Sequence, residues 1–481
     1  MVKNILVVGA SGYVGSQLVP VLAQKGYCVT ATGRDLKSLS TRSWSSLDNV
    51  NLVQLDLSIS RDLSSILKNI DVVFYLVHGM NDGTDFVKGE LYSAQNFSDQ
   101  LKNSQVKQLI YLGSLQPVSA HSKHFIARKK TGDILRESNI IVTELRAGII
   151  VGPGSAAFEV MRDFVYHLPI IITPKWMASH NSPIALENLL YYLTELLKLT
   201  FQNNNIFDVA GTELLTYKKQ MQIIAKLAGK KIHIIPLAFL TPNMAAYWLK
   251  IMTSVPTNIA KALVGGLQYD LSANGEQIQA LIPQPLLSFE QSVSNTFAHE
   301  NDIIDSAIWG FDKDALFRWQ PDYGYYPKQA GYTLKTTVSA KSLWKQIQLI
   351  GTQDGYFFAN ILWRIREWID HLVGGNSLKR YRRDPEKLAL GDQIDSWKVI
   401  SIKEDTFLSL LFGMKAPGLG RLEFNIVDKG TYRELDIRAW WHPAGIWGLL
   451  YWFMMMPAHL FIFKGMTKAI VKKCNTGKQS R

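Results

Sequence analysis

Three evenly spaced glycines near the start of the chain give the most specific indication of a chemical function. Gly9, Gly12 and Gly15 follow the apolar run 5–8 and open a segment with apolar residues at helical spacing. In such a unit the first glycine makes the turn, the second lets the backbone approach a pyrophosphate, and the third lets the helix pack on the strand. Amides and dipole at the helix start then bind the phosphates. The pattern predicts a dinucleotide site, with an ordinary tight turn as the alternative. The residues expected to contact the cofactor are Gly9, Ser11, Gly12, Tyr13, Val14 and Gly15.

An arginine lies at the end of the second predicted strand, the position that selects between NAD and NADP in dinucleotide-binding folds. Residues 27–32 read as the second strand, and Arg34 follows it. An acid at this strand end accepts the ribose 2′-hydroxyl of NAD, whereas an arginine accommodates the 2′-phosphate of NADP. Arg34 therefore favours NADP, although NAD is also compatible and a solvated loop arginine is the alternative.

Further polar or small residues stand at the ends of later strands. Asp56 and Leu57 end the run 51–57, where an Asp reaches the adenine amino group. Val77 ends the run 70–77 and would face the nicotinamide, and Ser114 follows the run 108–113. Strands and helices alternate over about 150 residues, as in a doubly wound α/β (Rossmann) fold with a parallel sheet. Such folds bind ligands at the carboxyl ends of their strands.

These residues, together with the segment 143–148, resemble the atypical short-chain dehydrogenase/reductase families, and the NmrA-like and complex-I-subunit-like members most closely. The resemblance covers about residues 1–290. It implies a Tyr-x-x-x-Lys pair in active members, in which the tyrosine transfers a proton and the lysine lowers its pKa. This chain offers only Phe125-x-x-x-Lys129 or His124-x-x-x-Arg128 in the matching helix.

The standard catalytic pair is therefore missing. Ser114 matches the serine that orients a substrate carbonyl in that family, although a strand-end serine bonded to backbone is an equal alternative. His124 is the candidate for proton transfer, and Lys129 is the candidate for holding a water that transfers the proton instead. Some members of these families bind NADP without turnover and act as sensors or assembly factors.

A second pattern begins after residue 335. Helices are expected around 343–347 and 357–372, followed by strands at 397–402, 407–414, 420–427 and 432–441 and a long apolar helix at 448–473. This order resembles START-like (polyketide cyclase, helix-grip) folds, which implies an apolar cavity for a small apolar molecule or lipid. The whole chain resembles a bacterial family that joins an NAD(P)-binding domain to a last domain of unknown function. The expected domains are 1–300 with a helical subdomain at its end, an aromatic-rich linker at 301–334, and 335–475.

Charge and the apolar C-terminal run raise the question of a membrane. The net charge is +12, and residues 341–481 hold 22 basic and 13 acidic residues, which gives 22 − 13 = +9. A basic surface of this kind meets anionic membranes or is simply solvated. Residues 444–463 carry no charged residue and are long enough to span a bilayer. We expect a helix buried by the sheet, with a span or a peripheral membrane contact as alternatives.

Other functions have little support. Basic residues are not interleaved with aromatic residues along a helix, so no nucleic-acid partner is expected. Cys28 and Cys474 lie far apart, which predicts no metal site and a reducing, cytoplasmic compartment. The first apolar run is already the cofactor strand, so no signal peptide is expected. The main hypothesis is an NADP-linked oxidoreductase whose second domain holds an apolar substrate. A non-catalytic NADP(H) sensor or assembly factor and a lipid carrier are the rivals, and the oligomeric state stays open.

Overall fold

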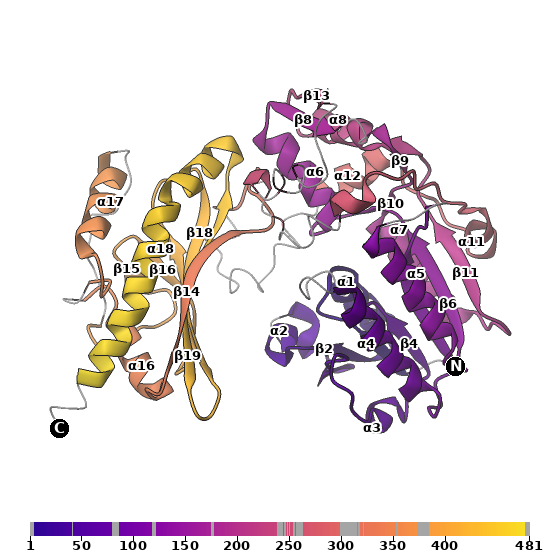
Figure 1. The fold of residues 1–481 in the computed structure, drawn as a ribbon, viewed down its shortest axis with the longest axis horizontal. Helices are drawn as coiled ribbons and strands as arrows, with labels where there is room; N and C mark the ends of the chain where they lie inside the picture. Colours follow the sequence, from indigo (N-terminus) through magenta and orange to yellow (C-terminus); the bar gives the residue numbers. More distant parts are fainter. Residues whose placement is uncertain are drawn as a thin grey trace. The chain divides into compact units, whose positions relative to one another are not determined.

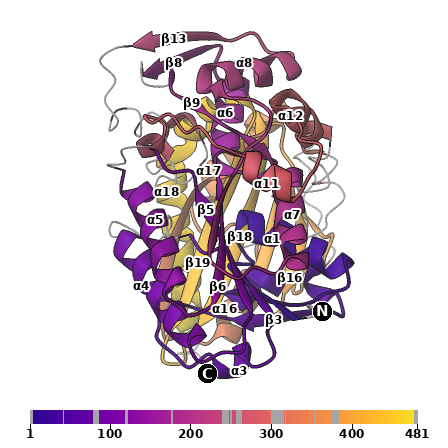
Figure 2. The same cartoon turned by 90° about the vertical axis from the view of Figure 1, so that its right-hand side faces the viewer.

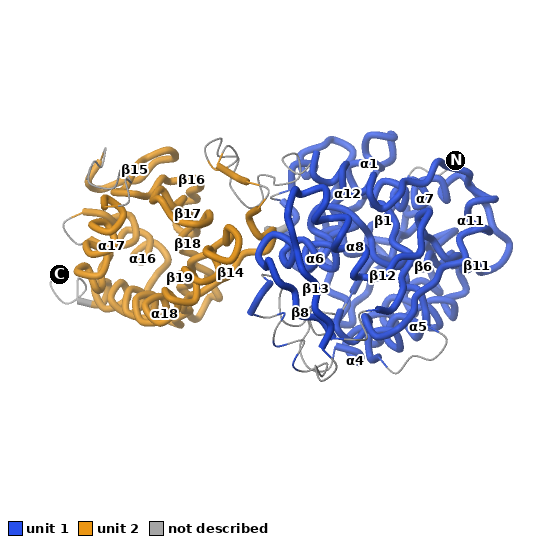
Figure 3. The backbone as a smooth tube through the Cα atoms, turned by 90° about the horizontal axis from the view of Figure 1, so that it is seen from above, with its two compact units in different colours: residues 1–303 blue, residues 304–481 orange. Residues whose placement is uncertain are grey.

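The computed structural model divides the chain into two compact units, residues 1–303 and 304–481 (Figure 3). Each unit is considered by itself. The described residues are 4–40, 42–78, 86–117, 122–174, 178–237, 244, 247, 249, 251–253, 255, 263–298, 315, 318–320, 322–352, 355–372 and 384–476.

The described part of unit 1 contains a seven-stranded parallel sheet of order β11-β6-β5-β4-β1-β2-β3 (Figure 1). The chain runs outward from β1 to β3 and then returns to the other side of β1 with β4. Strand order therefore reverses between β1 and β4, which is where doubly wound sheets bind their ligands. The expected fold class is confirmed. The strands are β1 Asn4–Val8, β2 Cys28–Gly33, β3 Val50–Gln54, β4 Val72–Tyr75, β5 Gln108–Ser114, β6 Ile141–Ala147 and β11 Asn205–Val209.

Helices cover both faces of this sheet. Ile5 and Val7 pack with α1 (Tyr13–Gln24) and α7 (Leu186–Glu195) on one face. Leu6 and Val8 pack on the other face, which α3 (Ser64–Leu67), α4 (Phe86–Leu101) and α5 (Lys123–Arg136) cover. Figure 2 shows α4 and α5 side by side. Because both faces of β1 are buried, its sequence is a continuous apolar run rather than an alternating one.

Most of the remaining elements of unit 1 follow β6 in the chain, whereas α2 lies between β2 and β3 and packs on both. After β6, the short strand β7 pairs with β10 and not with the main sheet. Most of the helical subdomain expected around 237–263 lies outside the described residues. These elements are α2 Leu36–Ser40, β7 Ile150–Val151, α6 Ala156–His167, β8 Ile170–Pro174, β9 His180–Asn181, β10 Ile184–Ala185, β12 Leu215–Thr216, α8 Tyr217–Leu227, β13 His233–Leu237, α11 Glu276–Leu281 and α12 Phe289–Ala298.

The described part of unit 2 is an antiparallel sheet of order β14-β19-β18-β17-β16-β15 with a long helix packed along it (Figure 1). Alternate strand residues such as Leu408 and Leu410 join Trp452 and Phe463 of the helix in one core. This arrangement is helix-grip-like, as the sequence predicted. Its elements are β14 Lys328–Thr336, α16 Ala340–Ile347, α17 Asn360–Leu372, β15 Gln393–Ile394, β16 Trp397–Lys403, β17 Phe407–Phe412, β18 Gly418–Asp428, β19 Arg433–Pro443 and α18 Gly445–Thr476.

The expected linker at 301–334 differs from the structure. Its last residues belong to β14, which pairs with β19 over nine residues. Trp319 is buried on the sheet face opposite α18, beside Ile400 and Leu411, and Arg318 Nη1 donates to the Phe412 carbonyl at 2.7 Å. Burial of the aromatic side chains on the sheet explains why the described residues of this segment are part of unit 2.

The long apolar helix α18 packs against the rest of unit 2 through one face only. Leu449, Trp452 and Met466 of α18 are buried, but only 28% of its most apolar stretch is buried. Within the described residues it is the one helix long and apolar enough to cross a membrane by length and composition. The expectation that burial by the sheet accounts for its apolar character is thus met only in part.

Candidate dinucleotide site and the interior of unit 2

Two of the three glycines are required by the protein's own packing. Gly9 ends β1 with φ +93°, and a Cβ there would lie 3.1 Å from the Leu76 carbonyl carbon. A Cβ on Gly15 would meet the Gly9 carbonyl oxygen and lie 2.9 Å from the Ala10 Cα. Gly9 therefore makes the turn and Gly15 lets α1 pack against it, as predicted.

Gly12 is a glycine for a different reason. Its φ of −74° suits any residue, it is exposed, and a Cβ there would meet only the Gly9 oxygen at 3.2 Å. Gly12 is also the N-cap of α1, and no side chain caps that helix. The first-turn amides of a helix have no intrahelical acceptor. Open space and uncapped amides thus coincide at the end of β1, which fits a pyrophosphate.

The other predicted loop residues contribute mainly backbone. The Val14 side chain is buried in the core, and the Tyr13 hydroxyl lies against Gly152. Ser11 offers its carbonyl to a second arginine, Arg42, whose Nη2 donates to it at 3.1 Å. Arg42 Nε is buried with no hydrogen-bond partner in the described structure, so a donor beside the loop lacks an acceptor.

The nucleotide-selecting end of the site therefore has two arginines. Arg34 is exposed just after β2, and Gln54 Nε2 donates to its carbonyl at 2.9 Å. The sequence singled out Arg34 but missed Arg42, which lies beyond α2. Only the tertiary structure brings Arg42 to the glycine loop.

Asp56 and Leu57 lie just past β3 and support a turn. The Asp56 carboxylate accepts from the Ser58 amide at 2.9 Å and the Ser58 hydroxyl at 2.7 Å. The hydroxyl hydrogen bond lowers the Asp56 pKa, and the amide adds to this effect. Leu57 is buried, and its carbonyl accepts from Asn96 Nδ2 at 3.0 Å. The Leu57 side chain thus belongs to the core rather than to the cofactor face.

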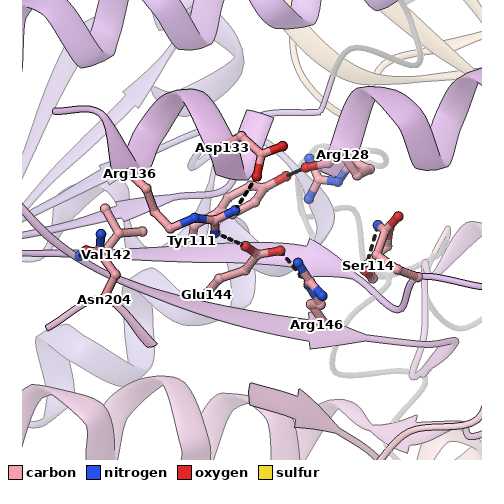
Figure 4. A network of polar contacts seen from close by, with 10 residues as sticks. Tyr111, Ser114, Arg128, Asp133, Arg136, Val142, Glu144, Arg146 and Asn204 are labelled. Atoms are coloured by element: carbon pink, nitrogen blue, oxygen red, sulfur yellow. Dashed lines mark hydrogen bonds and ion pairs between the residues drawn. The ribbon is translucent and has the colours of Figure 1, made fainter. Parts of the chain in front are cut away.

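A buried arginine ties together the ends of β4 and β5. Arg128 Nη1 donates to the Val77 carbonyl at 3.0 Å, Nη2 donates to the Leu112 carbonyl, and Nη1 lies 3.3 Å from Glu90 Oε1. The Tyr111 hydroxyl donates to the Arg128 carbonyl at 3.0 Å (Figure 4). The Arg128 guanidinium is therefore occupied by protein groups and holds the edge at which a nicotinamide would lie.

Two histidines stack at this edge. The rings of His78 and His124 are 5.0 Å apart at 14°, and His78 Nδ1 is 3.6 Å from Glu90 Oε2. Burial, with smaller effects of His78 and Arg128, lowers the pKa of His124 to about 3. Burial and Arg128 also lower the pKa of His78. Both imidazoles are neutral near pH 7.

Burial distinguishes the two alternatives for the catalytic pair, Phe125-x-x-x-Lys129 and His124-x-x-x-Arg128. Arg128 is buried and lies one helical turn after His124, whereas Lys129 is exposed. Exposure of Lys129 leaves its assignment as a catalytic candidate a prediction, whereas the contacts of Arg128 are those of a structural residue. Phe125 is buried beside Leu115 and Leu271. Ser114 ends β5, and its hydroxyl lies 3.4 Å from Gln116 Nε2.

A second buried charge network joins α5 to β6 (Figure 4). Glu144 is 1% exposed and accepts from Arg136 Nη1 and from Arg146 Nε at 2.8 Å. Arg136 Nη2 also donates to Asp133 at 2.6 Å. A Cβ on Gly132 would lie 2.6 Å from the Glu144 carboxylate. Local sequence patterns carried no signal for this network, because its members come from two different elements, α5 and β6.

The interior of unit 2 holds a guanidinium among aromatic rings. The Arg366 Cζ lies 5.5, 5.3 and 4.6 Å from the ring centres of Trp363, Trp397 and Phe412. The indole nitrogens of both tryptophans and Nδ1 of His459 are buried without a hydrogen-bond partner in the described structure. Burial and then Arg366 lower the pKa of His459 to about 4. The cluster therefore contains N–H groups that lack an acceptor.

No metal centre is found among the described residues, which contain no group of three or more His, Cys, Asp or Glu able to hold a metal ion. Both cysteines are free.

Comparisons with known proteins agree with this division. Residues 9–163 match the NAD(P)H-binding family model, and residues 329–466 match the family described as protein of unknown function (DUF2867). No curated protein matches the chain. Among solved structures, the chain is similar to UDP-glucuronic acid 4-epimerase from Bacillus cereus with UDP-glucuronic acid and NAD, at 16% identity and TM-score 0.48, covering 63% of this chain and 100% of that one. It is also similar to Citrobacter sp. triphenylmethane reductase complexed with NADP(H), at 18% identity and TM-score 0.49, covering 61% of this chain and 99% of that one.

Proposed function

We propose that this chain, an NAD(P)H-binding domain followed by a DUF2867 domain, is an NADP-linked oxidoreductase of an apolar substrate. The observation that supports nucleotide binding most directly is the exposed position of Gly12, where a Cβ would meet only one backbone oxygen, at 3.2 Å, and where uncapped amides begin α1. The two arginines near the loop, Arg34 and Arg42, support NADP because a 2′-phosphate needs cationic donors.

When bound, the nucleotide supplies or accepts a hydride at the edge formed by β4 and β5. In this proposal the Ser114 hydroxyl donates a hydrogen bond to a substrate carbonyl, and Arg128 keeps the strand ends in place. His124, with its lowered pKa, is neutral and donates a hydrogen bond rather than a proton from an imidazolium. Solvent is then the source of the proton.

We further propose that unit 2 holds the substrate. Its interior combines aromatic rings with Arg366 and the N–H groups of Trp363 and Trp397 that lack an acceptor. Because buried N–H groups are stabilised by acceptors, the ligand expected is an apolar molecule or lipid with an oxygen or anionic group at one end. Mass spectrometry of ligand extracted from purified protein tests this assignment, and recovery of only polar molecules would contradict it.

Calorimetry with NADPH and NADH tests the nucleotide site. We expect NADPH to bind, Arg34→Ala and Arg42→Ala to weaken NADPH at least about tenfold, and NADH to be affected little, because only NADPH carries the 2′-phosphate. Lys129→Ala, on the exposed side of α5, is the matched control. Absence of heat with both nucleotides would refute the proposal.

A non-catalytic NADP(H) sensor or assembly factor is the second candidate. The missing tyrosine and the neutral His124 favour it, because no described group at the strand ends titrates near neutral pH as a proton donor. The two functions are distinguished by measuring NADPH oxidation when the protein with bound NADPH is mixed with a broad panel of carbonyl compounds. Oxidation above the buffer rate supports the enzyme, and its absence with intact NADPH binding supports the sensor.

A further inference from the structure

Helix α17 turns its apolar side outward. Trp363, Glu367 and Asp370 are its buried residues, so both of its acidic side chains face the interior. Its exposed large apolar residues recur at helical spacing and share one face. They are Ile361, Ile365, Trp368, Ile369 and Leu372. A surface helix of a soluble protein normally shows the reverse pattern.

Helix α18 has a matching exposed apolar stripe. Trp447 is 72% exposed, and the other exposed apolar residues continue along the same helix as Leu450, Phe453, Met454, Leu460 and Phe461. The opposite face of α18 packs on the sheet of unit 2 through residues such as Trp452 and Met466. A full transmembrane span would have to remove that face from the sheet, so the geometry favours a helix lying on a membrane.

The segment that leads into α17 contacts α18. The Phe358 ring, two residues before α17, is 5.1 Å from the Phe461 ring of α18 and occupies the space beside Gly465. Both helices therefore belong to the same part of unit 2, and each carries an exposed apolar face. An exposed apolar area built by two helices marks an interaction surface.

The charges around this surface are complementary to anions. Beyond the apolar stripe, α18 continues on the same side with exposed Lys464, Lys468 and Lys472, and it contains no acidic residue. Arg364 is exposed on α17. Apolar side chains with tryptophans such as Trp368, which is 61% exposed, bordered by lysines are the composition of helices that insert into the lipid interface.

We propose that the outer faces of α17 and α18 dock on the surface of an anionic lipid bilayer. The apolar side chains enter the interfacial region, and the lysines contact the lipid head groups. Docking brings unit 2 to the phase in which lipid-like molecules are dissolved. It requires no nucleotide, so it stands or falls independently of the proposed oxidoreductase function.

Co-sedimentation of the full chain with lipid vesicles tests the docking surface. Vesicles of phosphatidylcholine with about a third phosphatidylglycerol are compared with pure phosphatidylcholine. We expect wild type to bind the anionic vesicles, with a blue shift of tryptophan emission and weaker binding at high salt. The double variant Ile365→Glu/Trp368→Glu is expected to bind at least about tenfold more weakly, because two inserted side chains become charged.

The matched control is Ile59→Glu/Ile206→Glu, which replaces two exposed isoleucines of unit 1 and should bind like wild type. Since exposed side chains are replaced, the urea midpoints of the variants and of wild type should agree. The double variant Trp447→Glu/Met454→Glu repeats the vesicle test on α18. The proposal is overturned if wild type stays in the supernatant or if both helix variants bind like wild type. A wild-type dimer that the helix variants convert to monomer, without vesicle binding, would also overturn it and assign the surface to a second copy.

Discussion

Glycines three residues apart have opposite physical roles at the start of α1. A Cβ on Gly15 would meet the Gly9 oxygen and the Ala10 Cα, whereas a Cβ on the exposed Gly12 would meet a single backbone oxygen at 3.2 Å. Spacing alone treats them as one motif. The space around each position separates the glycine that the fold requires from the glycine that a ligand would require.

This difference predicts opposite outcomes for two substitutions. Gly12→Val should leave the free energy of unfolding within about 1 kcal/mol of wild type. It should reduce NADPH affinity at least about a hundredfold, because the side chain fills the space for the phosphates. Gly15→Ala should destabilise unit 1 by about 1–3 kcal/mol through overpacking. Urea denaturation and calorimetry measure both. Equal destabilisation by the two variants would contradict the assignment.

The buried imidazole of His124 predicts acid sensitivity. Its pKa is lowered to about 3 in the folded chain, against about 6.5 when unfolded. Between these values the unfolded chain binds more protons, so the free energy of unfolding falls as pH drops from about 6.5 toward 3. The contribution is present above pH 6.5 and is lost on acidification.

His124→Gln, which cannot titrate, should show a shallower loss of stability in that window, by up to a few kcal/mol. Urea midpoints measured at a series of pH values check this. Identical pH profiles for variant and wild type would show that His124 does not titrate differently on folding. His180→Gln is a control, because His180 is exposed.

At the scale of elements, α5 is fastened to the sheet by charge as well as by apolar packing. Glu144 of β6 is almost fully buried and lies between Arg136 and Arg146. Glu144→Gln removes the buried negative charge between two partly buried arginines and leaves Arg136 with the exposed Asp133 as its ion-pair partner, so a loss of about 3 kcal/mol is expected. Asp133→Asn, at the exposed end of Arg136, should cost less than about 1 kcal/mol. Thermal unfolding with a circular dichroism readout compares them, and similar losses would contradict a buried role for Glu144.

The periodicity of helix α17 does not tell which of its faces is buried. Its apolar residues are spaced as in any amphipathic helix, and the pattern predicted the helix itself. The structure turns Glu367 and Asp370 inward and Ile365 and Trp368 outward. Asp370 Oδ1 accepts from the Lys415 amide at 2.8 Å, which holds the polar side against the sheet.

At the scale of the molecule, the two units have separate cores, around β1 and α1 in unit 1 and around β17 and α18 in unit 2. We expect two calorimetric transitions for the full chain. A hundredfold excess of NADPH over its Kd should stabilise only one of them, by about 2.7 kcal/mol, because the residues expected to contact the nucleotide all belong to unit 1. A shift of both transitions would mean that the units unfold together.

Local pattern by itself determined much of this protein. The glycine spacing, the doubly wound sheet and the strands β16–β19 followed from residues close together in sequence. The tertiary structure alone decided that Arg42 meets the glycine loop, that the Arg128 guanidinium contacts the strand ends, and that only 28% of the most apolar stretch of α18 is buried. Periodicity tells which residues share a face, since it is set by the backbone. What that face meets depends on residues far away in the chain, and only packing of the whole unit decides it.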